Sequence, residues 1–101
     1  MAIAARQGDG VSTGHGCDGS TTLAAPGQGT VRIEGALACR KGDLTVTHTI
    51  PAGDACVPHT ASISGSSGTV SIVGAKAARV GDGCDAGSIS SSTQSTVSIG
   101  N

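Results

Sequence analysis

The chain has 101 residues, a formal net charge of -1 and no Phe, Tyr or Trp. Its six basic and seven acidic residues are scattered singly, which excludes the basic surface typical of nucleic-acid binding and the charge block of a disordered tail. No apolar run approaches the length of about 18 residues that a membrane-spanning helix needs, and the first residues do not resemble a secretory signal. We therefore expect a single domain that folds in the cytoplasm.

The chain has few residues that could form a core. Only 18 are Ile, Leu or Val, whereas Gly, Ser and Pro make up 33. Each buried aliphatic side chain contributes roughly 1.5–3 kcal/mol, and ordering the chain costs about 1.5 kcal/mol per residue. We therefore expect a disulfide, a metal ion or a partner surface to supply additional stability.

Taken in chain order, one phrase, x-A-[AC]-R-x-G-D, occurs three times, at 3–9, 37–43 and 76–82. A second phrase, T-V-x-I, follows each copy at 30–33, 69–72 and 96–99. Self-similarity along the whole chain predicts three like units, at roughly 3–35, 36–74 and 75–100 of one domain covering 1–101. The segments between the phrases vary in length, so we look there for function.

Each unit begins with a predicted turn. The Arg and Asp of the first phrase lie three residues apart across a glycine, which predicts a tight turn closed by the side-chain pair. The pairs are Arg6 with Asp9, Arg40 with Asp43, and Arg79 with Asp82.

The rest of each unit predicts β-structure. Val and Ile alternate with polar residues in the second phrase, at Val31 and Ile33, Val70 and Ile72, and Val97 and Ile99, which is typical of a strand with one buried face. A shorter apolar seed at Leu23, Ile63 or Ile89 precedes it across a Gly- and Ser-rich stretch, so we expect a hairpin from each seed to the following Val. Gly35 and Gly74 then turn the chain into the next unit. The expected fold is all-β: a small, tapered cone of three hairpin repeats around a pseudo-threefold axis.

The variable segments contain six of the seven Cys and His residues. The favoured ligand set for one structural Zn²⁺ is His15, His48, His59 and Cys84, because it uses every histidine and draws on all three units. Cys17 and Cys56 remain possible alternative ligands. A Cys17–Cys56 disulfide is the competing source of stability, which a reducing compartment disfavours. Cys39 replaces an alanine of the other units and is expected to be a small buried residue.

The phrase Ala77-Ala78-Arg79-Val80-Gly81-Asp82, followed by Thr96-Val97-Ser98-Ile99-Gly100, resembles the PAAR repeat family, named for Pro-Ala-Ala-Arg. Gly14-His15-Gly16 also resembles the first metal-binding stretch of that family. The sequence departs from the family at the Pro position, which is Ile3, Leu37 or Lys76, and at Cys39. The resemblance extends from Ile3 to Gly100.

The resemblance implies a sharp β-cone with zinc near its vertex, where iron is the less favoured ion. Such cones cap the homotrimeric β-helical spike of type VI secretion systems or contractile phage tails, with one copy per trimer, and pierce a target membrane. The strands around Val31, Ile33, Val70, Ile72, Val97 and Ile99 would dock on the spike. We expect no enzymatic activity, no appended effector domain and, at most, non-covalently carried cargo.

Two alternative functions belong to classes other than a structural spike tip, namely a binding module and an enzyme. A free-standing, zinc-stabilised β-solenoid binding module could use Thr45, Thr47 and Thr49 as a flat ladder. A small zinc hydrolase would need an open coordination position and a general base, and Glu34 is the only glutamate.

Overall fold

The computed structural model describes residues 2–94 and 96–100, and none of them belongs to a helix. Consequently, no helix in this part of the chain could cross a membrane. The predicted all-β fold is confirmed. The strands are β1 (Ala2–Ile3), β2 (Gly10–Ser12), β3 (Ser20–Thr22), β4 (Arg32–Ile33), β5 (Ala36–Leu37), β6 (His48–Ala52), β7 (Ala55–His59), β8 (Ser71–Ile72), β9 (Ala75–Lys76), β10 (Gly83–Cys84), β11 (Gly87–Ser91) and β12 (Ser98–Ile99).

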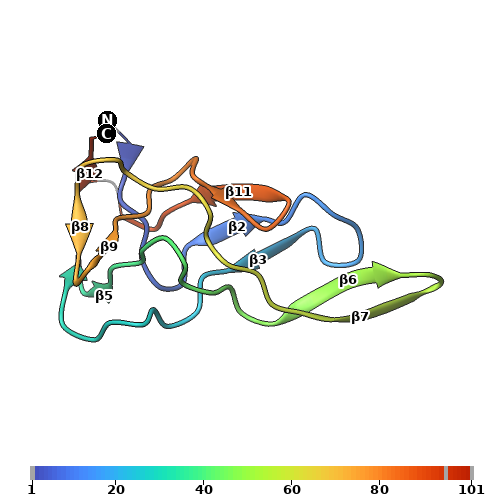
Figure 1. Ribbon diagram of the computed structural model, residues 1–101. Coiled ribbons are helices and arrows are strands. Elements are labelled where there is room, and N and C mark those ends of the chain that lie inside the picture. The colour runs from blue at the N-terminus through green and yellow to red at the C-terminus, as the bar shows by residue number, and fades with distance from the viewer. Residues whose placement is uncertain (1, 95, 101) are drawn as a thin grey trace.

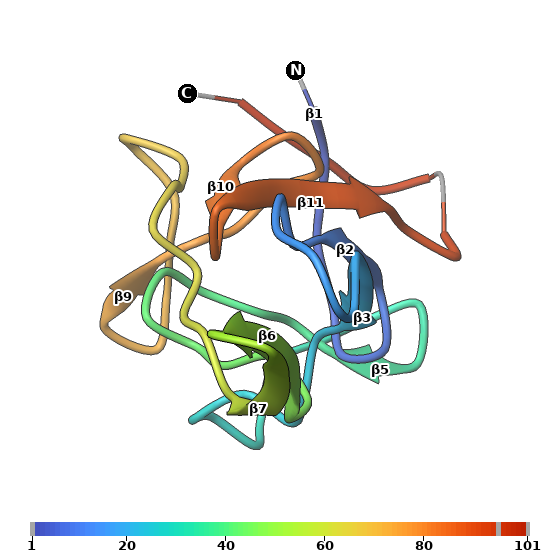
Figure 2. The same ribbon diagram turned by 90° about the vertical axis from the view of Figure 1, so that its right-hand side faces the viewer.

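The molecule is elongated, with principal extents of 41 × 24 × 22 Å. One end carries three two-stranded sheets, β1–β12, β4–β5 and β8–β9, together with both chain termini (Figure 1). The β6–β7 hairpin extends to the opposite end. A four-stranded sheet with the order β10-β11-β2-β3 lies between them. Seen along the long axis, β2–β3, β6–β7 and β10–β11 surround a common centre (Figure 2).

The three copies of the first phrase meet in a closed ring of backbone hydrogen bonds. The amide of Ala5 donates to the carbonyl of Ala78 at 3.0 Å, that of Ala78 to Cys39 at 3.1 Å, and that of Cys39 to Ala5 at 3.1 Å. All three residues are fully buried, with at most 1% of their surface exposed. Only small side chains fit where three chain segments approach this closely, which explains the Ala-rich phrase and confirms Cys39 as a small buried residue.

The predicted Arg–Asp turns are present in all three units. The backbone amides of Arg6, Arg40 and Arg79 donate to the carboxylate three residues later at 2.7–2.8 Å. Each guanidinium also donates to a backbone carbonyl at the end of a second-phrase segment, on Glu34, Val73 or Gly100. The turn therefore connects the beginning of each unit to the end of the same unit.

The predicted hairpin from each seed to the following Val is wrong. Leu23 forms an isolated bridge with Thr45, and β4 pairs instead with β5, which follows it directly. The two-residue turn between β4 and β5 has positive φ at both Glu34 and Gly35, the geometry that matches strand twist in short hairpins. The same turn joins β8 to β9 through Val73 and Gly74. The chain ends repeat the pairing, because β12 pairs with β1.

The alternation expected in the second phrase also needs correction. The isoleucines Ile33, Ile72 and Ile99 are buried, but Val31, Val70 and Val97 remain 37%, 38% and 36% exposed. Each valine precedes the strand and therefore does not share the buried face of the isoleucine two residues later. The tapered cone with a pseudo-threefold axis remains a prediction.

Candidate metal centre

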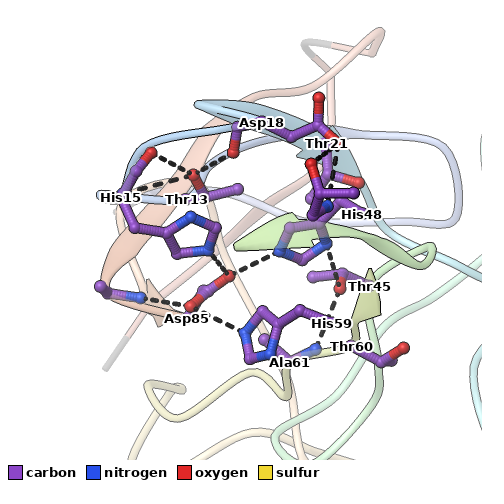
Figure 3. A network of polar contacts seen from close by, with 12 residues as sticks. Thr13, His15, Asp18, Thr21, Thr45, His48, His59, Thr60, Ala61 and Asp85 are labelled. Atoms are coloured by element: carbon purple, nitrogen blue, oxygen red, sulfur yellow. Dashed lines mark hydrogen bonds and ion pairs between the residues drawn. The ribbon is translucent and has the colours of Figure 1, made fainter. Parts of the chain in front are cut away.

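Three imidazoles and one carboxylate converge between the two ends of the molecule. Their ligand atoms all lie within 4.8 Å of one another, and the residues are His15, His48, His59 and Asp85 (Figure 3). We call this group the His3Asp cluster. His15 follows β2, His48 begins β6, His59 ends β7, and Asp85 follows β10. All three sequence units therefore contribute to it.

The register of one hairpin brings two of the imidazoles together. His48 pairs directly with His59 across β6 and β7. Directly opposite residues of an antiparallel pair project from the same face, so the two rings become neighbours, with centroids 5.0 Å apart. The two-residue turn at Gly53 and Asp54 sets this register.

His15 lies in the loop 13–19, which Thr13 closes. The Thr13 amide donates to the carbonyl of Gly19 at 3.0 Å, and its hydroxyl donates to the carbonyl of Asp18 at 2.7 Å. The loop packs so closely against the β10–β11 turn that a Cβ atom on Gly14 would lie 2.3 Å from the Ala86 carbonyl oxygen. Glycine is therefore required at position 14. The close packing of the loop against the turn places the His15 ring opposite Asp85.

Asp85 is the first residue of the two-residue turn between β10 and β11. Its φ is 57°, a left-handed conformation that aspartate tolerates better than most residues. The turn lies against β2, because a Cβ atom on Gly87 would be 2.0 Å from the carbonyl oxygen of Ser12. These constraints direct the carboxylate toward the imidazoles.

One carboxylate meets all three rings. Asp85 Oδ2 lies 2.8 Å from Nε2 of both His15 and His48, and Oδ1 lies 3.3 Å from Nε2 of His59. Partial burial of Asp85 would raise its pKa, but the hydrogen bonds with His15, His48 and His59 outweigh burial and lower it to about 2. The carboxylate is therefore ionised at neutral pH.

The other ring nitrogens show that a cation is needed here. Nδ1 of His15 lies 2.9 Å from the carbonyl oxygen of Gly16, and Nδ1 of His48 lies 2.9 Å from that of Val46. A carbonyl only accepts hydrogen bonds, so each Nδ1 carries the proton. In neutral imidazoles, Nε2 would then present a lone pair to an ionised carboxylate. Either protons on these rings or a metal ion must provide the compensating positive charge.

The donor set fits a divalent metal ion. Imidazole nitrogen and carboxylate oxygen are both zinc ligands, and four of them complete a structural site. Hydrogen bonds from Nδ1 to backbone carbonyls are the contacts that commonly orient metal-binding histidines. Protonating all three rings would instead place cations at centroid distances of 5.0–5.4 Å. One metal ion bound by all four side chains avoids the repulsion between protonated rings. It also avoids the repulsion between the Nε2 lone pairs and the Asp85 carboxylate.

Of the predicted ligands, His15, His48 and His59 are brought together, but Cys84 is not part of the cluster. Its side chain is fully buried in the core cluster that also contains Cys39 and Ile89. The turn begins directly after Cys84, so the next residue, Asp85, faces the imidazoles instead. The ligand set predicted from the sequence contained only Cys and His residues and therefore did not include Asp85. Its position beside Cys84 and three residues after the turn-forming Asp82 was the available signal.

Cys17 and Cys56 are not the alternative ligands that the sequence suggested, because they form the disulfide that was the disfavoured alternative. Their Cα atoms are 5.9 Å apart, although 39 residues separate them in the sequence. The prediction relied on the reducing compartment, which gives no information about proximity. The free cysteines are Cys39 and Cys84, and burial raises their pKa values to about 12 and 11, so both remain thiols.

The threonine ladder of the alternative binding module is not present. Thr45 is buried, and the hydroxyl of Thr49 donates to Asp18 at 2.9 Å, which leaves Thr47 as the exposed member. Glu34 accepts a hydrogen bond from Thr96 of the β12 segment, at the end of the molecule that carries the termini. It is therefore not placed to act as a base for the His3Asp cluster.

A scan against protein-family models gives no match, and none of the curated proteins compared with the chain shows significant similarity to it. The resemblance to PAAR repeats therefore depends on the repeated phrases.

Proposed function

We propose that this protein is the non-enzymatic, metal-stabilised tip of a contractile injection spike, of the kind that the PAAR resemblance implies. The observation that carries the proposal is the threefold repetition of contacts by the shared phrases. A trimeric spike presents three equal surfaces, and a single chain can match them only if it presents three similar surfaces of its own.

Three exposed valines provide such surfaces. Val31, Val70 and Val97 have nearly equal exposed fractions of 36–38%. Each stands beside one of the two-stranded sheets at the end that carries the termini (Figure 1). Apolar side chains next to short strands suit docking on strand ends of a β-helix. In this proposal, one copy of the chain caps one homotrimer.

The opposite end suits penetration of a target membrane. Residues 51–58 of the β6–β7 hairpin are all exposed, and the hairpin extends beyond the His3Asp cluster. A bound Zn²⁺ would hold the base of this hairpin to the loop 13–19 and to the β10–β11 turn. Iron is a second candidate ion, because a carboxylate in place of a thiolate makes the ligand set harder.

A binding experiment with a purified homotrimeric β-helical spike tests the proposal. The unmodified chain is expected to co-elute with the trimer at one copy per trimer, as measured by light scattering during size-exclusion chromatography. The triple variant Val31→Asp/Val70→Asp/Val97→Asp is expected to remain folded but not to bind.

The matched control is Val46→Asp/Val57→Asp, which places charges on exposed valines outside the proposed docking end. It should bind like the unmodified chain. Equal binding by the triple variant, or no binding by the unmodified chain, would contradict the docking proposal.

A further inference from the structure

The Cys17–Cys56 disulfide joins the two segments that carry the three imidazoles. Cys17 lies two residues after His15 in the loop 13–19, and Cys56 lies on β7, three residues before His59. His15 is the member of the His3Asp cluster that depends on this loop. Any movement of the loop away from β6–β7 would therefore separate His15 from His48 and His59.

Polar contacts hold the same two segments together beside the disulfide. Asp18 accepts hydrogen bonds from both the amide and the hydroxyl of Thr49 at 2.9 Å, and the amide of Asp18 donates to the carbonyl of Thr49 at 3.2 Å. Gly16 packs against Pro51, because a Cβ atom on Gly16 would lie 3.3 Å from the Pro51 ring. These contacts place the two sulfur atoms near each other without requiring the covalent bond.

Both cysteines are exposed. An external thiol or disulfide could therefore reach the bond without unfolding the core, unlike the buried Cys39 and Cys84. Accessibility of this kind favours exchange over permanent structural crosslinking.

We propose that the Cys17–Cys56 disulfide is a redox latch that controls how fast the ion leaves the His3Asp cluster. With the two thiols reduced, only the noncovalent contacts hold the loop 13–19 to β6–β7, so the loop opens more often and the ion exchanges faster. With the disulfide formed, His15 stays in place and the ion is retained. This inference rests on the proposed function, because a spike tip that folds in the cytoplasm and then crosses a membrane would pass from a reducing into an oxidising space.

The closing reaction is a thiol–disulfide exchange with a low-molecular-weight disulfide, RSSR. A thiolate at one cysteine attacks RSSR and releases RS⁻, and the second cysteine then attacks the mixed disulfide and releases another. The protein pair loses two protons and two electrons, and RSSR is reduced to two RSH. Reduction by excess thiol reverses both steps.

Release of Zn²⁺ to an excess of a chromogenic chelator tests the latch. Three zinc-loaded samples are compared: the chain oxidised with glutathione disulfide, the chain reduced and freed of reductant under anaerobic conditions, and Cys17→Ser/Cys56→Ser. We expect the oxidised chain to release zinc at least about tenfold more slowly than the other two. Alkylation under denaturing conditions followed by mass spectrometry should show that the oxidant adds only the Cys17–Cys56 link.

The matched control is the double serine variant treated with glutathione disulfide, whose release rate should not change because only Cys39 and Cys84 remain. Equal rates for the oxidised and reduced chain, each holding one zinc, would overturn the latch and leave the proposed function standing. Absence of bound zinc from every sample would overturn the latch together with the proposed metal centre. The comparison of the unmodified chain in two redox states remains decisive even if the serine variant does not fold.

Discussion

His48 and Asp85 are 37 residues apart in the sequence, yet His48 Nε2 and Asp85 Oδ2 lie 2.8 Å from each other. The contact joins the beginning of the β6–β7 hairpin to the β10–β11 turn. Nδ1 of the same ring faces a backbone carbonyl. This pair therefore needs a proton or a metal ion between its two halves, and the first two predictions follow from that need.

The ligand set can be tested by replacing the two adjacent residues Cys84 and Asp85 one at a time. Asp85→Asn removes the anionic ligand but keeps the size of the side chain, and we expect it to lower zinc affinity by about 10- to 100-fold. Cys84→Ala should keep one zinc per chain and lower the free energy of unfolding by about 1–2 kcal/mol through the lost core packing. Isothermal titration calorimetry measures the zinc affinity, elemental analysis measures the zinc content, and urea unfolding measures the free energy of unfolding. Loss of zinc in Cys84→Ala with full binding in Asp85→Asn would mean that the thiol is the ligand.

The stability of the metal-free protein should depend on pH in a specific direction. The hydrogen bond with the Gly16 carbonyl, followed by the contact with Asp85, raises the pKa of His15 above 6.5. Its protonated form therefore stabilises the fold below pH 6.5, and this contribution is lost as the pH rises through the folded-state pKa. Asp85, with a pKa lowered from 3.8 to about 2, stabilises the fold above pH 3.8 and loses this effect as the pH falls to about 2.

Urea unfolding between pH 2 and pH 9, with a chelator present, measures this dependence. The free energy of unfolding should be highest between pH 3.8 and pH 6.5, where Asp85 is ionised and His15 is protonated, and it should fall above pH 6.5. With zinc bound, the fall above pH 6.5 should disappear, because the metal replaces the proton on the imidazoles. A metal-free protein that becomes more stable from pH 6 to pH 9 would contradict the charge arrangement described above.

Gln28 is expected to stabilise the end that carries the termini. Its amide nitrogen donates to the carbonyls of Val31 and Ala38 at 2.9 Å, and its amide oxygen accepts from the amides of Thr30 and Val31. The side chain is buried, so Gln28→Ala would leave these backbone groups without partners and cost about 2–4 kcal/mol. Denaturant unfolding measures the loss. Gln7→Ala, at an exposed position, is the control and should change stability by less than about 0.5 kcal/mol.

Gly87 is expected to tolerate no side chain. A methyl group there would lie 2.0 Å from the carbonyl oxygen of Ser12, so Gly87→Ala must push β11 away from β2. We expect a loss of about 3 kcal/mol or more, together with weaker zinc binding because Asp85 moves. Thermal unfolding and zinc titration report the two effects. Gly68→Ala, which has open space around it and no positive φ, should change neither; a similar effect at both positions would refute the steric explanation.

The all-β fold and the grouping of the three histidines were predictable because they depend on local or repeated signals. Val and Ile alternate with polar residues, the Arg–Asp turn closes within four residues, and each unit repeats both patterns. The histidines could be grouped because they occupy the same kind of variable segment in successive units. Their convergence then required only that the units pack around one another.

The strand pairing partners and the fourth member of the His3Asp cluster could not be predicted in this way. The seed residue Leu23 bridges to Thr45 of the next unit, and which of two nearby segments a short strand joins depends on turn geometry and packing across the whole molecule. Likewise, Cys84 ends β10 with its side chain in the core, whereas Asp85 begins the turn in a left-handed conformation that directs its carboxylate toward the imidazoles. The sequence pattern does not locate the end of the strand between these two residues. The Cys17–Cys56 bond joins residues 39 positions apart, and only the approach of the loop 13–19 to β7 brings them into reach. The repeats in the sequence therefore determined that the chain folds as three similar β units. Long-range packing between these units determined which side chains meet in the His3Asp cluster.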